Sequence, residues 1–341
     1  MPHTIHIAGG DIAFTQHAGD TVLRAALRAG IGLPYECNSG GCGSCKFEVV
    51  EGEFTSLWPE APGLTERDRR KPTRQLACQC VAAGDLTIKA RPAAECVPRV
   101  APRRLRARLA ATEDVTVDIR EFRFVADEGT ADFLPGQYAS VSVEGVAAPR
   151  CYSMSNLPNA AGEWHFQIRR VPGGAATTRL FDDLRVGTEV EIDGPYGLAY
   201  LRTDNPRDIV CVAGGSGLAP MVSIARGAAA AGMLGTRKLH FLYGGRTPPD
   251  LCGESHLRAL RGCEAAIAYH PVVSDAGSAS AQRWDGKVGF VHEWLRPVLG
   301  EDLTSYEFYF AGPPPMTQAI QELLMVECKV PYPQIHFDRF F

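Results

Sequence analysis

Three cysteines in a glycine-rich stretch constrain this chain more than any other feature. Cys37, Cys42 and Cys45 follow C-x4-C-x2-C spacing, which is the plant-type spacing for the ligands of a [2Fe-2S] cluster. The glycines between them can take positive φ, so that backbone N–H groups turn toward the sulfides of a dianionic cluster. The sequence therefore predicts a loop that holds an iron–sulfur cluster.

The fourth ligand is expected from the segment L-A-C-Q-C, where Cys78 and Cys80 both qualify. Spacing alone does not choose between them. A structural zinc site of four cysteines is the alternative, but such sites usually pair two short C-x2-C hooks, and only one is present here. The cysteine spacing and the glycines together favour an iron–sulfur cluster over a zinc site.

Length and composition limit the remaining choices. A chain of 341 residues exceeds one ordinary core and predicts two or three domains. The net charge of −4 argues against a nucleic-acid binder. No basic flank precedes an apolar run at the N-terminus, and no apolar stretch is long enough to span a bilayer. With an odd count of 11 cysteines, the pattern indicates a soluble, cytoplasmic protein with reduced thiols.

Residues 1–92 are predicted to form a small α+β domain. Residues 5–7 and 12–14 alternate as a strand hairpin, and Asp20 is expected to cap a helix that Gly30 ends. Further strands are expected at 47–49 and 86–88.

Residues 93–102 contain a proline-rich run without hydrophobic period, which predicts a semi-rigid linker. Five arginines lie at or just after this run. They either dock an acidic partner or form a solvated linker and an exposed strand face, and the second reading is favoured. These arginines are Arg99, Arg103, Arg104, Arg106 and Arg108.

Residues 103–204 alternate repeatedly between turn signals, with one short helical stretch at 177–184, and this pattern predicts an antiparallel barrel. Its strands are expected around 105–109, 115–119, 139–143, 166–168 and 190–192. Residues 205–341 instead alternate strands with helices, which predicts a doubly wound α/β domain. Its buried parallel strands are expected at 209–213, 239–243, 266–273 and 306–311.

Several short motifs are candidates for nucleotide binding. The turn Gly214–Gly217 follows a buried strand and opens a helix, which suits a pyrophosphate or simply tight packing, and it is not the G-x-G-x-x-G fingerprint. In R-C-Y-S, Tyr152 can stack on a planar ring and Arg150 can bind phosphate, or they are a core residue and a surface charge. The run Ala311–Met316 ends the last long strand, at the sheet edge where ligands bind.

Taken together, these motifs and the terminal D-R-F resemble the NAD(P)H-dependent reductase components of multicomponent aromatic-ring oxygenases, most closely those of toluene monooxygenase and carbazole dioxygenase. The resemblance covers essentially the whole chain. It implies a β-grasp [2Fe-2S] ferredoxin domain, an antiparallel FAD-binding barrel and a doubly wound NAD-binding domain.

The resemblance also implies roles for individual residues. The cluster ligands fall on Cys37, Cys42, Cys45 and Cys78, which leaves Cys80 as a bystander. Flavin binding falls on Arg150, Tyr152, Ser153, Gly174 and Thr177, and nicotinamide nucleotide binding on Gly215, Gly217, Gly312 and Pro313. Phe340 matches the terminal aromatic that covers the isoalloxazine ring, so it and Ser153 are the expected catalytic residues. Ala311 stands where many relatives have cysteine, and Thr177 where serine is commoner.

The function implied is electron delivery from NADH through FAD and the cluster to a terminal oxygenase or its ferredoxin. No sequence feature indicates the oligomeric state, and a monomer is the default expectation. The oxygenase is a Rieske dioxygenase or a diiron monooxygenase. NADPH stays open, because Asp250 suits ribose hydroxyls whereas Arg246 suits a 2′-phosphate. The alternatives are a stand-alone flavin, quinone or ferredoxin reductase and a zinc-stapled binding module.

Overall fold

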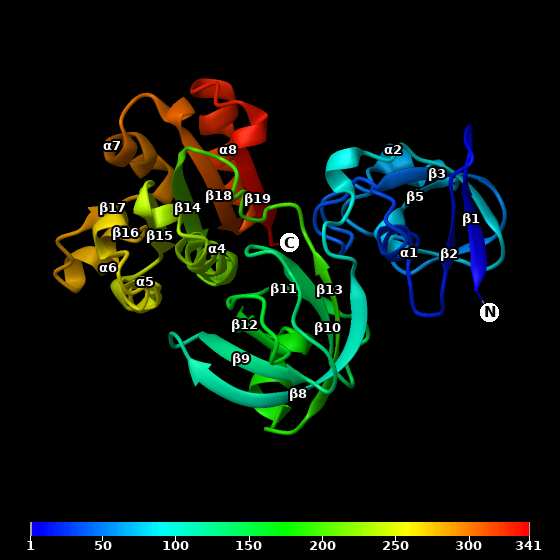
Figure 1. Cartoon of the computed structure of the whole chain (residues 1–341), viewed down its shortest axis with the longest axis horizontal. Helices are drawn as coiled ribbons and strands as arrows, with labels where there is room; N and C mark the ends of the chain where they lie inside the picture. The colour runs from blue at the N-terminus through cyan, green and yellow to red at the C-terminus, as the bar shows by residue number, and fades with distance from the viewer. Residues whose placement is uncertain (1, 341) are drawn as a thin grey trace. The chain divides into compact units, whose positions relative to one another are not determined.

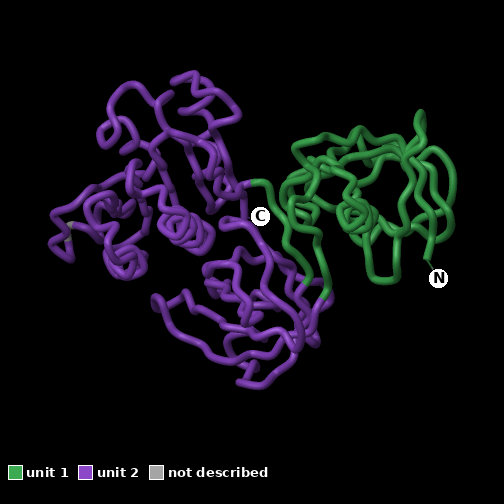
Figure 2. The backbone as a smooth tube through the Cα atoms, in the orientation of Figure 1, with its two compact units in different colours: residues 1–104, 193–198, 341 green, residues 105–192, 199–340 purple. Residues whose placement is uncertain are grey.

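The structure is a computed structural model that describes residues 2–340, except for the side chain of Ser280. Residues 1 and 341, at the ends of the predicted domain ranges, lie outside it. The chain divides into two compact units (Figure 2). Unit 1 holds the chain up to Arg104 together with Asp193–Leu198, and unit 2 holds Leu105–Ile192 and Ala199–Phe340.

Unit 1 is built on a five-stranded mixed sheet of order β2-β1-β7-β3-β5. The predicted hairpin is confirmed, with Ile5 opposite Phe14, and β1 then pairs in parallel with β7. Helix α1 follows the hairpin and buries its apolar residues, which gives the β-grasp arrangement. The elements are β1 (His3–Ile7), β2 (Ala13–Gln16), α1 (Val22–Arg28), β3 (Lys46–Glu51), β4 (Phe54–Ser56), α2 (Glu66–Arg69), β5 (Arg74–Leu76), β6 (Cys80–Ala82) and β7 (Leu86–Lys89).

The predicted helix cap at Asp20 is wrong by one residue. Thr21 is the N-cap, and its hydroxyl accepts a hydrogen bond from the Arg24 N–H. Asp20 instead accepts from the guanidinium groups of Arg28 and Arg104. Charge-assisted hydrogen bonds are the stronger ones, so two arginines draw the carboxylate away from the helix end.

The first half of unit 2 is a six-stranded antiparallel sheet of order β11-β10-β13-β8-β9-β12. A bridge between Met154 and Phe166 joins its two edges, so the sheet is a nearly closed barrel. Fully buried aromatic side chains, among them Trp164 and Phe122, fill it. Its elements are β8 (Arg103–Asp114), β9 (Ile119–Ala126), β10 (Tyr138–Ser142), β11 (Arg150–Ser153), β12 (Glu163–Arg169), α3 (Ala175–Thr178) and β13 (Glu189–Tyr196). The first residues of β8 and the last residues of β13 belong to unit 1.

One predicted barrel strand is displaced. Residues 115–118 form a bend between β8 and β9, and Val117 is 92% exposed. The strand starts at Ile119 and buries Phe122 and Phe124. The alternation of Val115, Val117 and Ile119 has the period of a strand, but the residues that pack into the core are the phenylalanines that follow it.

The second half of unit 2 is a parallel sheet of order β17-β16-β15-β14-β18-β19 with helices on both faces (Figure 1). Apolar residues of α4 and α5 pack with one face of β14, and those of α7 and α8 with the other. The order reverses between β14 and β18, which is the switch point where ligands bind in such sheets. The elements are β14 (Asp208–Gly214), α4 (Leu218–Ala230), β15 (Leu239–Gly245), α5 (Glu254–Arg258), β16 (Ile267–Val273), α6 (Ala276–Ala281), β17 (Lys287–Val288), α7 (Leu295–Leu299), β18 (Tyr306–Gly312), α8 (Pro314–Gln321) and β19 (Ile335–Arg339). Within residues 2–340, no helix has the length and apolar character needed to cross a membrane.

Candidate functional site

The four cysteines expected around the cluster lie in two pairs. Cys37 Sγ is 3.2 Å from Cys42 Sγ, and Cys45 Sγ is 3.4 Å from Cys78 Sγ. A zinc ion draws four donors to one point, yet nowhere in residues 2–340 do three Cys, His, Asp or Glu side chains converge on one ion position. A [2Fe-2S] cluster with four thiolates over two irons fits two pairs instead.

Each pair contains one sulfur with a lowered pKa. The hydrogen bond from Cys42 lowers the pKa of Cys37 to about 5, and the bond from Cys78 likewise lowers that of Cys45. The same bond raises the pKa of the partner thiol, Cys42 or Cys78. Thiolates are the form that binds metal, so the short contact within each pair favours the metal-binding form of Cys37 and of Cys45.

Cys80 is set apart from these pairs. It is fully buried on β6, and burial raises its pKa to about 12, so it stays a protonated thiol. Cys78, two residues earlier, sits on a short 3-10 turn (Ala77–Gln79) that turns its sulfur toward Cys45. This geometry supports Cys78 as the fourth ligand.

The backbone of the cluster loop also faces sulfur. The N–H of Cys42 points at Cys37 Sγ and the N–H of Ser44 at Cys42 Sγ, each at 3.4 Å. Gly40 and Gly43 take positive φ to allow this path. Such N–H donors stabilise the negative charge of a cluster and tune its potential.

Asn38 is a cluster-loop residue that the sequence analysis missed. It is 3% exposed at a φ of 51°, and neither polar atom of its side-chain amide has a hydrogen-bond partner among the described residues. Buried polar groups are rarely left unpaired, so this amide fits a site completed by a polar group such as a cluster. An asparagine inside a glycine loop, where it tolerates positive φ, was the available signal.

The expected flavin residues of β11 differ in their surroundings. Ser153 is 5% exposed, and its hydroxyl lacks a partner among residues 2–340, as expected of a group that awaits a ligand. Tyr152 is half-buried, and its ring lies 6.5 Å from that of Phe166, so it also packs against the barrel core. Arg150 is exposed and donates to the Ala148 carbonyl oxygen.

The expected phosphate turn is held by its own hydroxyl. Thr177 Oγ1 accepts from the Val171 N–H at 3.2 Å and lies 3.2 Å from the Gly174 carbonyl oxygen. Gly174 is the N-cap of α3, whose first N–H groups have no helical acceptor. The Thr177 hydroxyl therefore shapes the turn, and the donors left for a phosphate are backbone N–H groups.

The two loops expected to bind the nicotinamide nucleotide touch each other. A Cβ on Gly217 would lie 1.9 Å from the Ala311 carbonyl oxygen, and one on Gly312 would lie 3.0 Å from the Gly214 carbonyl oxygen. Gly215 takes a φ of 57°, and its carbonyl oxygen accepts from the Tyr243 hydroxyl. Close approach of the backbones requires glycine at position 217, whereas the positive φ favours it at 215. The loops meet at the switch point of the sheet.

A cavity of about 420 Å³ opens beside these loops. Gly214 and Gly215 line it with Pro313 from the second loop, and Asp250 lies at its edge after β15. The barrel contributes Arg169 and Asp118, whose side chains pair at 2.6 Å. The sequence analysis missed both residues, because nothing local in the sequence relates them to Gly215.

Phe340 lies at this same sheet end. Its N–H donates to the Gly312 carbonyl oxygen at 3.0 Å, which continues the pairing of β19 with β18. Its ring is half-buried against the core formed by β14 and α4. The sheet thus places Phe340 next to the nucleotide loops.

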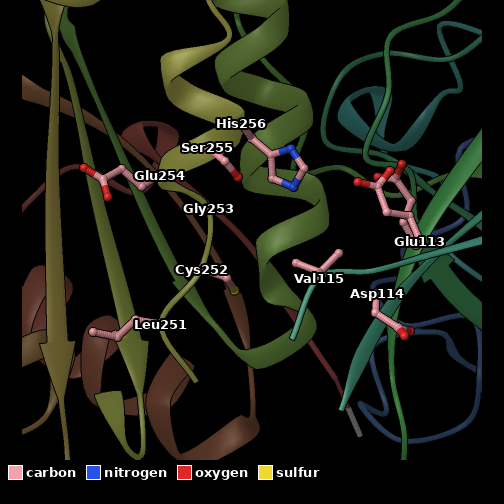
Figure 3. A pocket seen from close by; sticks show the side chains of 10 residues that line it. Glu113, Asp114, Val115, Leu251, Cys252, Gly253, Glu254, Ser255 and His256 are labelled. Carbon is pink, nitrogen blue, oxygen red and sulfur yellow. The ribbon is translucent and has the colours of Figure 1, made fainter. Parts of the chain in front are cut away.

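A second cavity, of about 270 Å³, lies between β8 and the segment before α5, and Figure 3 shows side chains from the two elements on its opposite sides. Glu113, Asp114, Glu121 and Glu254 line it. Each of these carboxylates forms an ion pair with an arginine, and the residues that line this cavity include no glycine turn like that of the larger one.

Three family descriptions match successive parts of the chain. They are a 2Fe-2S iron–sulfur cluster binding domain over residues 5–83, an oxidoreductase FAD-binding domain over 106–200 and an oxidoreductase NAD-binding domain over 211–322. The residues present fit all three groups: two thiol pairs, an unpartnered buried hydroxyl and a glycine cradle.

Curated relatives and solved structures match nearly the whole length. The ferredoxin–NAD(P)+ reductase CarAd of Metapseudomonas resinovorans is 41% identical, over 97% of this chain and 98% of its own. The ferredoxin–NAD+ reductase component of the alkene monooxygenase system of Xanthobacter autotrophicus is 43% identical, over 96% and 98%. The solved ferredoxin reductase of carbazole 1,9a-dioxygenase superposes with a TM-score of 0.92 at 37% identity, over 100% of this chain and 99% of that one.

Proposed function

We propose the following function for this chain, which belongs to the family of ferredoxin–NAD(P)+ reductase components of oxygenase systems. It carries electrons from NADH through FAD and a [2Fe-2S] cluster to an oxygenase or its ferredoxin. The observation that carries this function is the presence, in one chain, of two thiol pairs and a glycine-lined nucleotide cavity. FAD, when bound, supplies the link that these two sites need, because it accepts one hydride, which carries two electrons, and passes these electrons on one at a time.

The cluster would be held by the thiolates of Cys37, Cys42, Cys45 and Cys78. The sulfurs of each pair lie close enough to share a metal ion. Cys80 stays outside, since its thiol is buried with a raised pKa.

Flavin binding uses β11 and the turn before α3. Ser153 offers its hydroxyl to the ring system, and the half-buried Tyr152 offers a ring face. Arg150 and the N–H groups that follow Gly174 bind phosphate, while Thr177 keeps that turn in shape.

The nicotinamide nucleotide binds along Gly215, Gly217, Gly312 and Pro313. Phe340, at the end of β19, would cover the flavin ring and give way when nicotinamide binds. NADH is preferred over NADPH, because the Asp250 carboxylate, which already accepts two hydrogen bonds from Thr247, accepts ribose hydroxyls and repels a 2′-phosphate.

The acceptor is the terminal oxygenase of an aromatic-ring system or its ferredoxin. The relatives' names include carbazole and naphthalene dioxygenase, xylene/toluene monooxygenase and phenol 2-monooxygenase systems, so both Rieske and diiron partners are within this proposal. The chain works as a monomer in the cytoplasm, where its 11 cysteines stay reduced.

Anaerobic titration with NADH tests this function. Purified protein should contain one FAD and two irons, and NADH should bleach first the flavin and then the cluster absorbance. Protein without iron, or a cluster that dithionite bleaches and NADH does not, would contradict the proposal. A stand-alone quinone reductase is distinguished by full quinone turnover after loss of the cluster.

A further inference from the structure

Residues 57–63 form a segment that packs directly on the cluster loop. The N–H of Gly63 donates to the Gly40 carbonyl oxygen at 2.9 Å, and the indole of Trp58 lies 3.2 Å from where a Cβ on Gly40 would be. At the other end, the N–H of Leu57 donates to the Gln79 carbonyl oxygen at 2.8 Å. The segment therefore touches both stretches of chain that carry the thiols.

The segment packs against the cluster loop too closely to allow a side chain at the contacting glycines. A Cβ on Gly63 would come within 2.7 Å of the Gly40 oxygen and the Gly43 nitrogen, and one on Gly43 within 2.7 Å of the Gly63 oxygen. Real Cβ atoms do not approach other atoms so closely, so only glycine at these positions allows the two backbones to lie this near each other. The positions of Leu57 and Trp58 relative to the thiols are fixed accordingly.

Leu57 and Trp58 nevertheless face solvent. Leu57 is 58% exposed and Trp58 is 44% exposed. Adjacent large apolar side chains in water mark interaction sites, and tryptophan is enriched at the centre of protein interfaces. A patch of two side chains is small, which suits the short-lived encounters of electron-transfer partners.

The helix that follows this segment supplies positive charge. The exposed Glu60 carboxylate lies 3.7 Å from the Arg69 guanidinium, and the exposed Glu66 carboxylate lies 3.9 Å from the Arg70 guanidinium. The remaining acidic residue, Asp68, is buried and turned inward, where Lys46 and Arg74 neutralise it.

Two exposed cations of this helix and the turn after it stay unbalanced. Arg67 and Lys71 have no carboxylate partner among the residues that the structure describes. A surface with this excess of positive charge attracts and orients an acidic protein.

We infer that Leu57 and Trp58, together with the exposed cations Arg67 and Lys71 of the following helix and turn, form the docking surface for the electron-accepting protein of the oxygenase system, whose own docking face is acidic. This inference rests on the proposed function. An acceptor must approach the cluster closely, and this patch is joined by a hydrogen bond to Gln79, whose side-chain amide lies 3.8 Å from Cys78 Sγ. The apolar side chains and the exposed cations both lie within residues 57–71, and Arg69 joins the two parts through its hydrogen bonds to the Glu60 and Ala61 carbonyl oxygens.

Binding to protein probes of opposite charge tests the surface. The probes are an acidic plant-type [2Fe-2S] ferredoxin and a basic cytochrome c, and the readouts are the dissociation constant by titration calorimetry and its salt dependence. We expect Trp58→Ser and the double variant Arg67→Glu/Lys71→Glu each to weaken ferredoxin binding about tenfold, which is roughly 1.4 kcal/mol. The charge reversal should strengthen cytochrome c binding.

Matched controls separate this surface from general effects. Val117→Ser removes another exposed apolar side chain, and Lys238→Glu/Arg261→Glu reverses two exposed cations of unit 2. Both should leave ferredoxin binding within a factor of two, and every variant is first checked for an unchanged cluster absorption spectrum. Equal weakening by the controls, or unchanged binding in both patch variants, overturns the inference.

Two further outcomes separate this inference from the proposed function. Wild-type protein that holds its cofactors but reduces no protein acceptor contradicts the proposed function. Wild-type protein that reduces the ferredoxin while the patch variants bind it normally contradicts only the docking surface. If Trp58→Ser slows cluster reduction by NADH and leaves binding unchanged, this chain's own flavin domain occupies the patch, and the inference is again overturned.

Discussion

The guanidinium of Arg28, at the end of α1, lies 2.7 Å from the carboxylate of Asp193, 165 positions further along the chain. Asp193 is 2% exposed, and it also accepts from the Tyr196 hydroxyl and lies 3.5 Å from Arg24. The segment Asp193–Leu198 is thereby built into unit 1, where the N–H of Gly197 also donates to the hydroxyl of Tyr35, two residues before Cys37.

Asp193→Ala should therefore destabilise unit 1. Removing the carboxylate leaves Arg28 mostly buried with only Asp20 as its acidic partner, and breaking a buried ion pair costs roughly 2–4 kcal/mol when part of the network survives. Urea denaturation followed by cluster absorbance measures the loss. Glu60→Ala removes an exposed carboxylate and should change stability by less than about 0.5 kcal/mol; equal effects would contradict the network.

Cys78→Ser and Cys80→Ser form a matched pair, two residues apart. We expect Cys78→Ser to lose most cluster iron, because Cys45 loses its neighbouring sulfur. Cys80→Ser should keep two irons per chain, with a modest loss of stability from a buried hydroxyl. Iron analysis and visible circular dichroism decide, and iron loss in Cys80→Ser alone would reverse the ligand assignment.

Gly217→Ala should weaken NADH binding. The added methyl would meet the Ala311 carbonyl oxygen at 1.9 Å, so the two nucleotide loops must separate. We expect the Kd for NADH to rise about tenfold or more, roughly 1.4 kcal/mol, with FAD content unchanged.

Gly235→Ala is the control for that change, because it lies in the same unit and a Cβ there meets nothing within 4 Å. Equal Kd values for the two variants would show that the loops tolerate separation.

Acid should weaken unit 2 through His270. Burial, then the charge of Lys287 and the stacked ring of His240, lowers its pKa to about 4, from about 6.5 in an unfolded chain. The unfolded chain then binds more protons, so the contribution of His270 is complete above about pH 6.5 and is lost as the pH falls toward 4.

The ring is half-buried, so its contribution is roughly 1 kcal/mol after solvent screening. Thermal melts of wild type and His270→Gln across this range measure it as the difference between their two curves. The Tm of the variant should fall less steeply, and parallel curves would exclude His270 as the cause.

Local pattern predicted those features whose cause is local. Alternation at Ile5 and Phe14 gave the hairpin, and the apolar run before Gly214 gave the central parallel strand. The cysteine spacing predicted a loop whose sulfurs the structure pairs. In these cases the periodicity or spacing within a short stretch is itself the physical determinant.

What the sequence could not supply depends on distant partners. The position of Asp20 predicts a helix cap, but in the structure its carboxylate accepts hydrogen bonds from Arg28 and Arg104 instead. Arg169 and Asp118 reach the nucleotide cavity only because the barrel brings them there. The link between Asp193 and Arg28 joins segments that no local pattern relates.

The glycine contacts between residues 40–43 and 63 have a consequence for how such a protein diversifies. On that side the peptide groups of Gly40, Gly43 and Gly63 meet one another directly, whereas Leu57 and Trp58 also expose 58% and 44% of their surface to solvent. Exchanging the outward side chains can thus alter recognition of an electron acceptor while the peptide N–H groups that face the cysteine sulfurs keep their positions.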